Sequence, residues 1–201
     1  GSINVASSTM QGGSATILGE QLSVDGSVDS SGATGGGIIN VGGDFQGGNS
    51  NLSNAQNVNV SGSLKADSII SGSGGRVIVW ADGVTTFTGD ISATGFTSGG
   101  FAEVSGKNIL NFKGIVDLTS DSGVVGTLLL DPTNITISNV GTHTSIATSG
   151  STNLDPSATT GSIISLSTLN AALASSNVTI QTAAGGGAEV GNISVDSGLA
   201  I

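Results

Sequence analysis

The single histidine of the chain, His143, is the first candidate for acid–base or nucleophilic chemistry. It lies between Gly141-Thr142 and Thr144-Ser145, in a polar stretch. A serine–histidine–aspartate triad depends on geometry that composition does not supply. The sequence contains neither a G-x-S-x-G elbow nor a G-x-G-x-x-G phosphate loop. We therefore expect His143 to be a polar loop residue, and we keep it only as a candidate ligand contact.

Paired acids are the second candidate, because two carboxylates facing one groove would suit a glycosidase. Four aspartates could share one face of the fold: Asp82, Asp90, Asp117 and Asp121. The repeat of the sequence, however, sets Asp90 beside Ile115 and Asp82 beside Lys107. Since no clustered set of acids marks a substrate groove, we expect a protein that is not an enzyme. A polysaccharide-active enzyme remains a remote alternative.

Metal and thiol chemistry have little support in the sequence. The chain has no cysteine, which excludes a disulfide framework, a thiolate metal site and a cysteine nucleophile. The G-G-x-G-x-D calcium repeat and the EF-hand loop are also missing. Asp29, Asp117 and Asp131 lie near predicted turns, and turn chemistry explains them. We expect neither a cofactor nor a metal ion.

The aromatic residues could form a platform for a carbohydrate. Phe87 and Phe112 hold equivalent places in two successive copies of the repeat. We therefore expect these two rings to stack inside the fold, where the pair adds about 1 kcal/mol. Trp80 lies at a strand end and Phe96 in a glycine-rich turn, and both are kept as candidate ligand contacts.

The charge balance excludes several partners. The net charge is −10, and the basic residues are Lys65, Arg76, Lys107 and Lys113. Nucleic acid needs a basic footprint that neutralises phosphates, and an anionic membrane surface attracts basic segments. No run approaches the ~18 apolar residues of a membrane helix. We therefore expect no nucleic-acid partner and no direct membrane insertion.

The elements that would position these residues repeat along the chain. Within residues 74–137 one pattern is written twice: a glycine pair, a short strand, a turn, an apolar run closed by glycine, and a third strand. Arg76 and Phe101 hold the same place in the two copies, and a third copy begins at Thr127. A period of about 25 residues indicates units that stack on their neighbours. Because parallel crossovers are right-handed, the sequence predicts an all-β, right-handed parallel β-helix, a solenoid with three short strands per coil.

The flanking segments follow the same plan with interruptions. A polar stretch at 47–54 is expected to form a loop extruded from one corner, and 138–161 an irregular excursion without a sustained period. One short helix is expected near 167–174, opened by a hydroxyl cap. Strands are predicted after it at 177–180, 188–190 and 193–195. We interpret residues 1–201 as a single β-helix segment excised from a longer chain, because the pattern stops midway.

Four ordered motifs, spread over a stretch of about a third of the chain, carry a family resemblance. They are Gly75–Asp82 (GRVIVWAD), Thr86–Gly89 with Ile91–Ala93, Gly100–Lys107 (GFAEVSGK) and Gly126–Pro132 (GTLLLDP). In this order they resemble the filamentous-haemagglutinin-like exoproteins and high-molecular-weight adhesins of two-partner secretion systems. The resemblance implies a β-helical rod, and the matching motifs are structural rather than catalytic.

The resemblance also implies a cellular context. Such exoproteins pass through a dedicated outer-membrane pore, which recognises a secretion domain whose Asn-Pro-Asn motifs this chain lacks. We expect a secreted or bacterial cell-surface location and a receptor on a host or bacterial surface. The expected function is structural and adhesive: a rigid rod that displays binding loops for cell or host attachment. Direct capture of a haem carrier or a glycan by the 138–161 excursion is the open alternative.

The resemblance also suggests glycosylation, because some adhesins of this kind carry sugars at N-x-S/T sequons. The chain has five sequons, at Asn51, Asn59, Asn134, Asn177 and Asn192. In a sequence so rich in Asn, Ser and Thr, chance is a sufficient explanation of their number.

Overall fold

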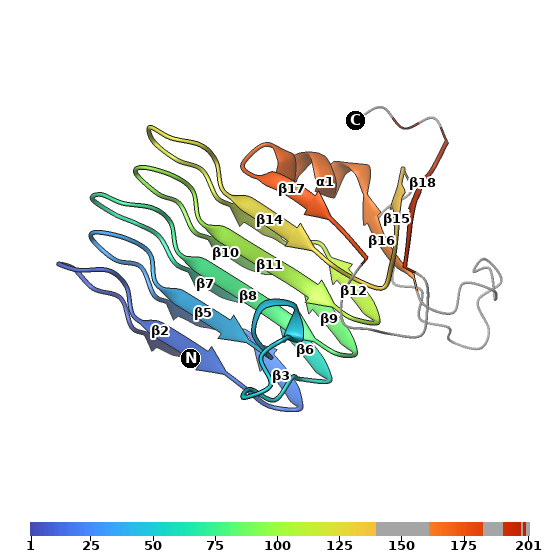
Figure 1. The fold of residues 1–201 in the computed structure, drawn as a ribbon, viewed down its shortest axis with the longest axis horizontal. Helices are drawn as coiled ribbons and strands as arrows, with labels where there is room; N and C mark the ends of the chain where they lie inside the picture. The colour runs from blue at the N-terminus through green and yellow to red at the C-terminus, as the bar shows by residue number, and fades with distance from the viewer. Residues whose placement is uncertain (140–160, 183–190, 198, 200–201) are drawn as a thin grey trace.

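The computed structural model describes residues 1–139, 161–182, 191–197 and 199. These residues form a mostly β protein whose strands pair in parallel (Figure 1). The expectation of a β fold with parallel strands is confirmed. Among the described residues there is one α-helix, and no helix there is long and apolar enough to cross a membrane.

The strands form four parallel sheets. The first holds β1 (Ser2–Asn4), β4 (Ser27–Asp29), β7 (Ser63–Lys65), β10 (Asp90–Ser92) and β13 (Ile115–Asp117). The second holds β2 (Ser14–Ile17), β5 (Ile38–Val41), β8 (Arg76–Ala81), β11 (Phe101–Gly106), β14 (Thr127–Leu130) and β17 (Asn177–Ile180). The third holds β3 (Gln21–Val24), β6 (Asn57–Val60), β9 (Val84–Phe87) and β12 (Ile109–Phe112), and the fourth β15 (Asn134–Ser138), β16 (Ser162–Ser165) and β18 (Asn192–Val195).

From β1 to β14, consecutive strands belong to different sheets, and each strand pairs with the third strand before or after it. The pairing keeps the spacing that the sequence predicts. Phe101 lies opposite Arg76 on one side and Thr127 on the other, and Asp90 lies opposite Ile115. Equivalent positions of successive repeats are therefore neighbours in space, and this confirms the predicted period of the repeat.

The core lies between the sheets, on the inward face of each strand. Val77 and Val79 of β8 are fully buried, as is Val104 of β11. The predicted aromatic stack is confirmed: the rings of Phe87 and Phe112 lie 5.7 Å apart between centroids, with an interplanar angle of 8°. Burial of such rings supplies much of the hydrophobic free energy of folding.

Both faces of β8 are buried. Ile78 and Trp80, on the opposite face of β8 from the core, are 0% and 1% exposed. They are covered by residues 42–56, which contain a short 3-10 helix, η1 (Phe45–Gly47), and which contact β8. The insertion expected to extrude from a corner instead folds back, because it buries apolar surface that would otherwise face water.

The carboxy-terminal part holds the expected helix. It is α1 (Leu166–Leu173), one residue earlier than predicted, and its N-cap is Ser165, whose hydroxyl accepts a hydrogen bond from the Thr168 N–H at 3.1 Å. The helix packs against β13, β16 and β17. Most of the predicted 138–161 excursion and the predicted strand at 188–190 lie outside the described residues.

Candidate functional site

Residues 42–56, which we call the strap, connect β5 to β6 and lie across the outer face of β8 (Figure 1). The strap backbone lies close against Trp80: a Cβ built on Gly47 would be 2.5 Å from the indole Nε1. Gly47 also has a φ of 59°, which favours glycine. The strap thus closes a small apolar cluster of Ile78, Trp80 and Phe101 that is separate from the main core.

Polar groups anchor the indole under the strap. The Trp80 Nε1–H donates to Asp82 Oδ1 at 3.0 Å. Asn54, near the end of the strap, donates from its amide nitrogen to the same Asp82 oxygen at 3.1 Å and to the Gly47 carbonyl at 3.1 Å. One carboxylate therefore holds the tryptophan and the strap together.

Gln46 makes the second set of anchors, at the tip of the strap. Its backbone N–H donates to Glu103 Oε2 at 3.0 Å, and its side-chain amide donates to Asp131 Oδ2 at 3.1 Å. Gln181 donates to the same Asp131 oxygen at 2.7 Å. Gln46 has a φ of 53°, a left-handed conformation that is uncommon for a residue with a side chain. The hydrogen bonds to the two carboxyls hold this conformation in place.

Glu103 is the unusual member of this group. It is 0% exposed, and Ile78 and Leu129 lie opposite it on the neighbouring strands. Burial, with a smaller contribution from the nearby Asp131, raises the pKa of Glu103 to about 7, although hydrogen bonds from the Gln46 N–H and the Ser105 side chain act to lower it. A carboxyl with this pKa can hold or release a proton near neutrality, but under the closed strap it faces no substrate groove.

A more exposed ion pair lies at the edge of the strap. Arg76 Nη2 is 2.6 Å from Asp44 Oδ1, and its guanidinium lies 5.8 Å from the centre of the Phe45 ring. Phe45 in turn meets Phe101 edge to face, with 5.8 Å between centroids. Hydrogen bonds from Asn49 and from the Phe45 N–H, together with Arg76, hold the pKa of Asp44 below its ordinary value. These contacts fasten the strap to β8 and β11.

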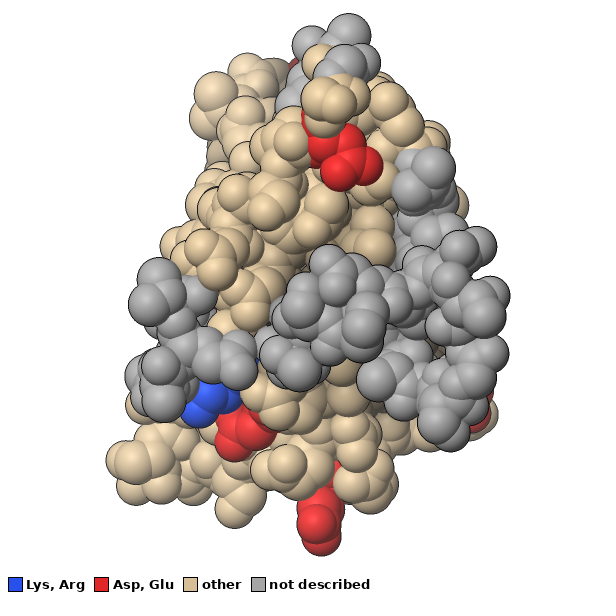
Figure 2. Space-filling view, turned by 90° about the vertical axis from the view of Figure 1, so that its right-hand side faces the viewer, with Lys and Arg blue, Asp and Glu red and all other residues tan. Residues whose placement is uncertain are grey.

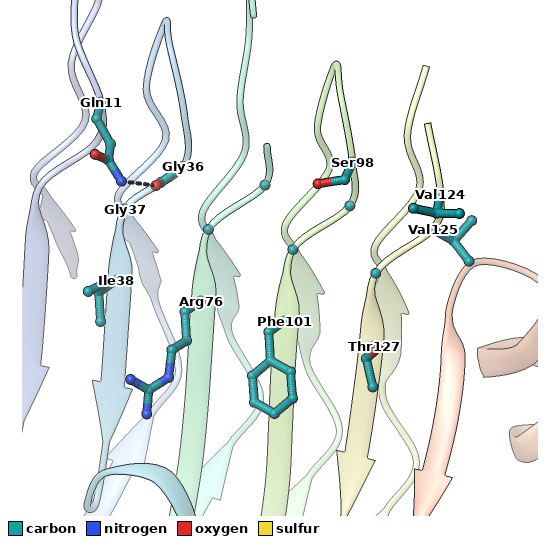
Figure 3. A pocket seen from close by; sticks show the side chains of 15 residues that line it. Gln11, Gly36, Gly37, Ile38, Arg76, Ser98, Phe101, Val124, Val125 and Thr127 are labelled. Carbon is teal, nitrogen blue, oxygen red and sulfur yellow. Dashed lines mark hydrogen bonds between the residues drawn. The ribbon is translucent and has the colours of Figure 1, made fainter. Parts of the chain in front are cut away.

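An open groove of about 560 Å³ crosses the amino-terminal ends of the second-sheet strands. Its floor is made of glycine backbone, with Ile38, Arg76 and Phe101 on one side and Ser98 and Val124 on the turns of the other (Figure 3). No carboxylate is among the residues that line it. The groove is therefore no place for a two-carboxylate mechanism.

The three predicted ligand contacts do not come together in the described part of the chain. Trp80 is 1% exposed beneath the strap, so its ring offers no face to a ligand while the strap is closed. Phe96 is 44% exposed in the turn between β10 and β11, where its carbonyl accepts a hydrogen bond from Ser122. His143 lies outside the described residues, so capture of a ligand by the 138–161 excursion stays a prediction.

Sequence reasoning missed Gln46, Glu103 and Asp131 as a group. A signal for Glu103 was available, because the repeat places it between Ile78 and Leu129, and an acid between two outward apolar residues points to a cover. No periodicity predicts Gln46, which lies in an insertion without a counterpart in the other repeats.

The described residues include no group of potential metal ligands, and one of their five sequons is exposed on the strap. Within them, no three His, Cys, Asp or Glu side chains are grouped so as to hold a metal ion. Asn51 is exposed on the strap, whereas the other four sequon residues lie within strands: Asn59, Asn134, Asn177 and Asn192.

Among the described residues visible in Figure 2, charged side chains are few: the acidic groups are scattered and the basic ones occupy one small area. The described part of the chain is thus a mostly β protein with parallel sheets, and its most unusual feature is the strap that covers the carboxyl groups of Glu103 and Asp131. Comparison with protein-family models and with curated proteins found no match for the chain. The likeness to two-partner-secreted adhesins therefore stays a prediction.

Proposed function

We propose that the chain is a right-handed parallel β-helix with three short strands per coil, and that its function is mechanical. The observation that carries this proposal is the unbroken register of the second sheet. Its first positions form one row across six strands: Ser14, Ile38, Arg76, Phe101, Thr127 and Asn177. Stacked coils of this kind make a stiff rod, because each coil is held by its two neighbours.

In this proposal the rod is a structural and adhesive segment of a secreted bacterial surface exoprotein. Its secretion pore would recognise a domain outside this chain, and its receptor would lie on a host or bacterial surface. The turns on one edge of the rod support this role, because they expose apolar side chains that a rod alone does not need. Ile69, Phe96 and Val124 are 67%, 44% and 74% exposed. Exposed apolar groups on surface turns are suited to contact with another surface.

A non-enzymatic role also agrees with the site chemistry. Glu103, whose pKa near 7 would suit an acid catalyst, is fully buried, and the open groove has no carboxylate lining it. The family-like motifs have structural positions instead. Val77, Val79 and Val104 belong to the core, and Trp80 lies under the strap.

A bead-attachment assay tests the adhesive proposal. Beads coated with the purified chain should attach to epithelial cells or to bacterial lawns more than beads coated with heat-unfolded chain or albumin. The same preparation should release no reducing ends from a polysaccharide panel. Attachment no greater than that of albumin beads would contradict the adhesive role, and reproducible turnover would replace it with an enzymatic one.

A further inference from the structure

We propose that the strap is a proton-controlled cover over Trp80: it stays closed while Glu103 is protonated and is released when Glu103 ionises. The proposal concerns residues 42–56 and does not depend on the adhesive function. It rests on the way the strap is anchored, on the surroundings of Glu103, and on the two glycines of positive φ at the start and near the tip of the strap.

The tip of the strap is held by hydrogen bonds to the carboxyl groups of Glu103 and Asp131. Gln46 contacts both of them, by its backbone N–H to Glu103 and its side-chain amide to Asp131. It holds a left-handed conformation that release would relax. Gly42 and Gly47, with φ of 79° and 59°, lie at the start of the strap and just after the tip. Glycines in this region of φ let the backbone turn without a steric penalty from a side chain.

The surroundings of Glu103 favour its neutral form in the closed state. Ile78 and Leu129 flank it, so an ionised carboxylate there has apolar neighbours on both sides. Burial is the largest cause of the raised pKa of Glu103, and Asp131, in the segment after β14, adds to it, whereas the Gln46 N–H, the Ser105 side chain and Arg76 on β8 lower it. An ionised Glu103 accepts a stronger hydrogen bond from the Gln46 N–H, but the cost of burying its charge outweighs this gain, so the closed state favours the neutral acid. Arg76 is 2.6 Å from the strap residue Asp44, so its charge is already paired.

Asp82 is a further acidic group under the strap, and it accepts hydrogen bonds from Trp80 and Asn54. Its contacts hold the indole and the end of the strap, and they do not involve Glu103. Release of the strap would bring Glu103 into water, where a carboxylate is well solvated and its pKa returns towards the ordinary value of 4.5.

The direction of the pH effect follows from these two values. Because the closed-state pKa of about 7 is above the ordinary 4.5, closure is favoured most below pH 4.5. That advantage is lost progressively as the pH rises to about 7, and it changes little at higher pH. The difference between the two pKa values corresponds to a rise of up to about 300-fold in the opening constant across this window.

The chain supplies its own probe, because Trp80 is its only tryptophan and it has no tyrosine. Acrylamide quenching of Trp80 fluorescence is measured from pH 4.5 to pH 8.5. We expect quenching to rise reversibly with pH up to about 7 and then to level off, while the far-UV circular dichroism stays unchanged. Glu103→Gln, which cannot ionise, should stay weakly quenched throughout. Glu20→Gln, a matched change at an exposed residue, should follow the wild-type chain.

Three outcomes would overturn the proposal. One is wild-type quenching that does not change with pH, and another is a rise that Glu103→Gln retains. The third is a change in circular dichroism that accompanies the rise, since global unfolding would then explain the exposure of Trp80. Should Glu103→Gln fail to fold, Glu103→Met replaces it, because a methionine side chain suits the apolar neighbours Ile78 and Leu129. Its quenching should likewise stay weak at every pH.

Discussion

Replacing Gly99 with alanine should destabilise the chain by about 4 kcal/mol or more, which is exceptional for the addition of one methyl group. A Cβ at Gly99 would lie 1.8 Å from the carbonyl oxygen of Leu118 and 2.3 Å from the nitrogen of Gly126. Both are backbone atoms, so no side-chain rotation relieves the clash. The backbone segments packed around Gly99 would have to separate, and the loss of stability would appear as a lower midpoint in urea unfolding.

Gly35→Ala is the matched control for this substitution. Gly35 lies in the equivalent turn of an earlier repeat, but the nearest atom to its added Cβ is a Gln11 side-chain carbon at 3.6 Å, an ordinary contact distance. We expect the free energy of unfolding of this variant to lie within about 0.5 kcal/mol of the wild-type value. Equal effects of the two substitutions would show that the repeats are not packed as closely as described.

Replacing Phe112 with alanine should cost about 3–5 kcal/mol, the range found for buried aromatic residues. Phe112 is 2% exposed and stacks on Phe87, which is 0% exposed. The change therefore leaves a cavity that two adjacent repeats share. Phe87→Ala should have a similar cost, and the double variant should lose about 1 kcal/mol less than the sum, because the ring pair itself is removed only once.

The control for the aromatic pair is Phe96→Ala. Phe96 is 44% exposed in a turn, so its removal should change the free energy of unfolding by less than about 1 kcal/mol. Urea unfolding of Phe87→Ala, Phe112→Ala, the double variant and Phe96→Ala measures the loss of stability in each case. Strictly additive losses for Phe87 and Phe112 would argue against direct stacking.

The repeating part of the fold could be predicted from sequence because its cause is local and periodic. The constant spacing of the repeat aligned Phe87 with Phe112, and the two residues lie opposite each other on β9 and β12. The short helix was predicted for a similar reason, since good helix formers follow a hydroxyl residue. Its cap is Ser165, two residues before the predicted start, and helix ends are set by backbone geometry that composition defines poorly.

The strap could not be predicted in this way. Alternation in β8 separates Val77 and Val79 from Ile78 and Trp80, but it does not say what covers the outward pair. The cover comes from the preceding repeat, in an insertion whose Gln46 adopts a left-handed conformation. The position of Glu103 between Ile78 and Leu129 in the repeat points to a cover, but it does not identify the strap as that cover or Gln46 as the partner of the carboxyl.

The central claim, that successive repeats stack in register as a rod, is tested most directly by distances between spin labels. The chain has no cysteine, so labels attach only at introduced cysteines. Ser14→Cys with Asn177→Cys spans five strand pairings of the second sheet, and Ser2→Cys with Ile115→Cys spans four of the first. At about 4.8 Å per pairing, we expect narrow distributions near 24 Å and 19 Å, allowing for the length of the labels. Broad distributions without these maxima, or a second-sheet distance shorter than the first-sheet one, would contradict the stacked arrangement.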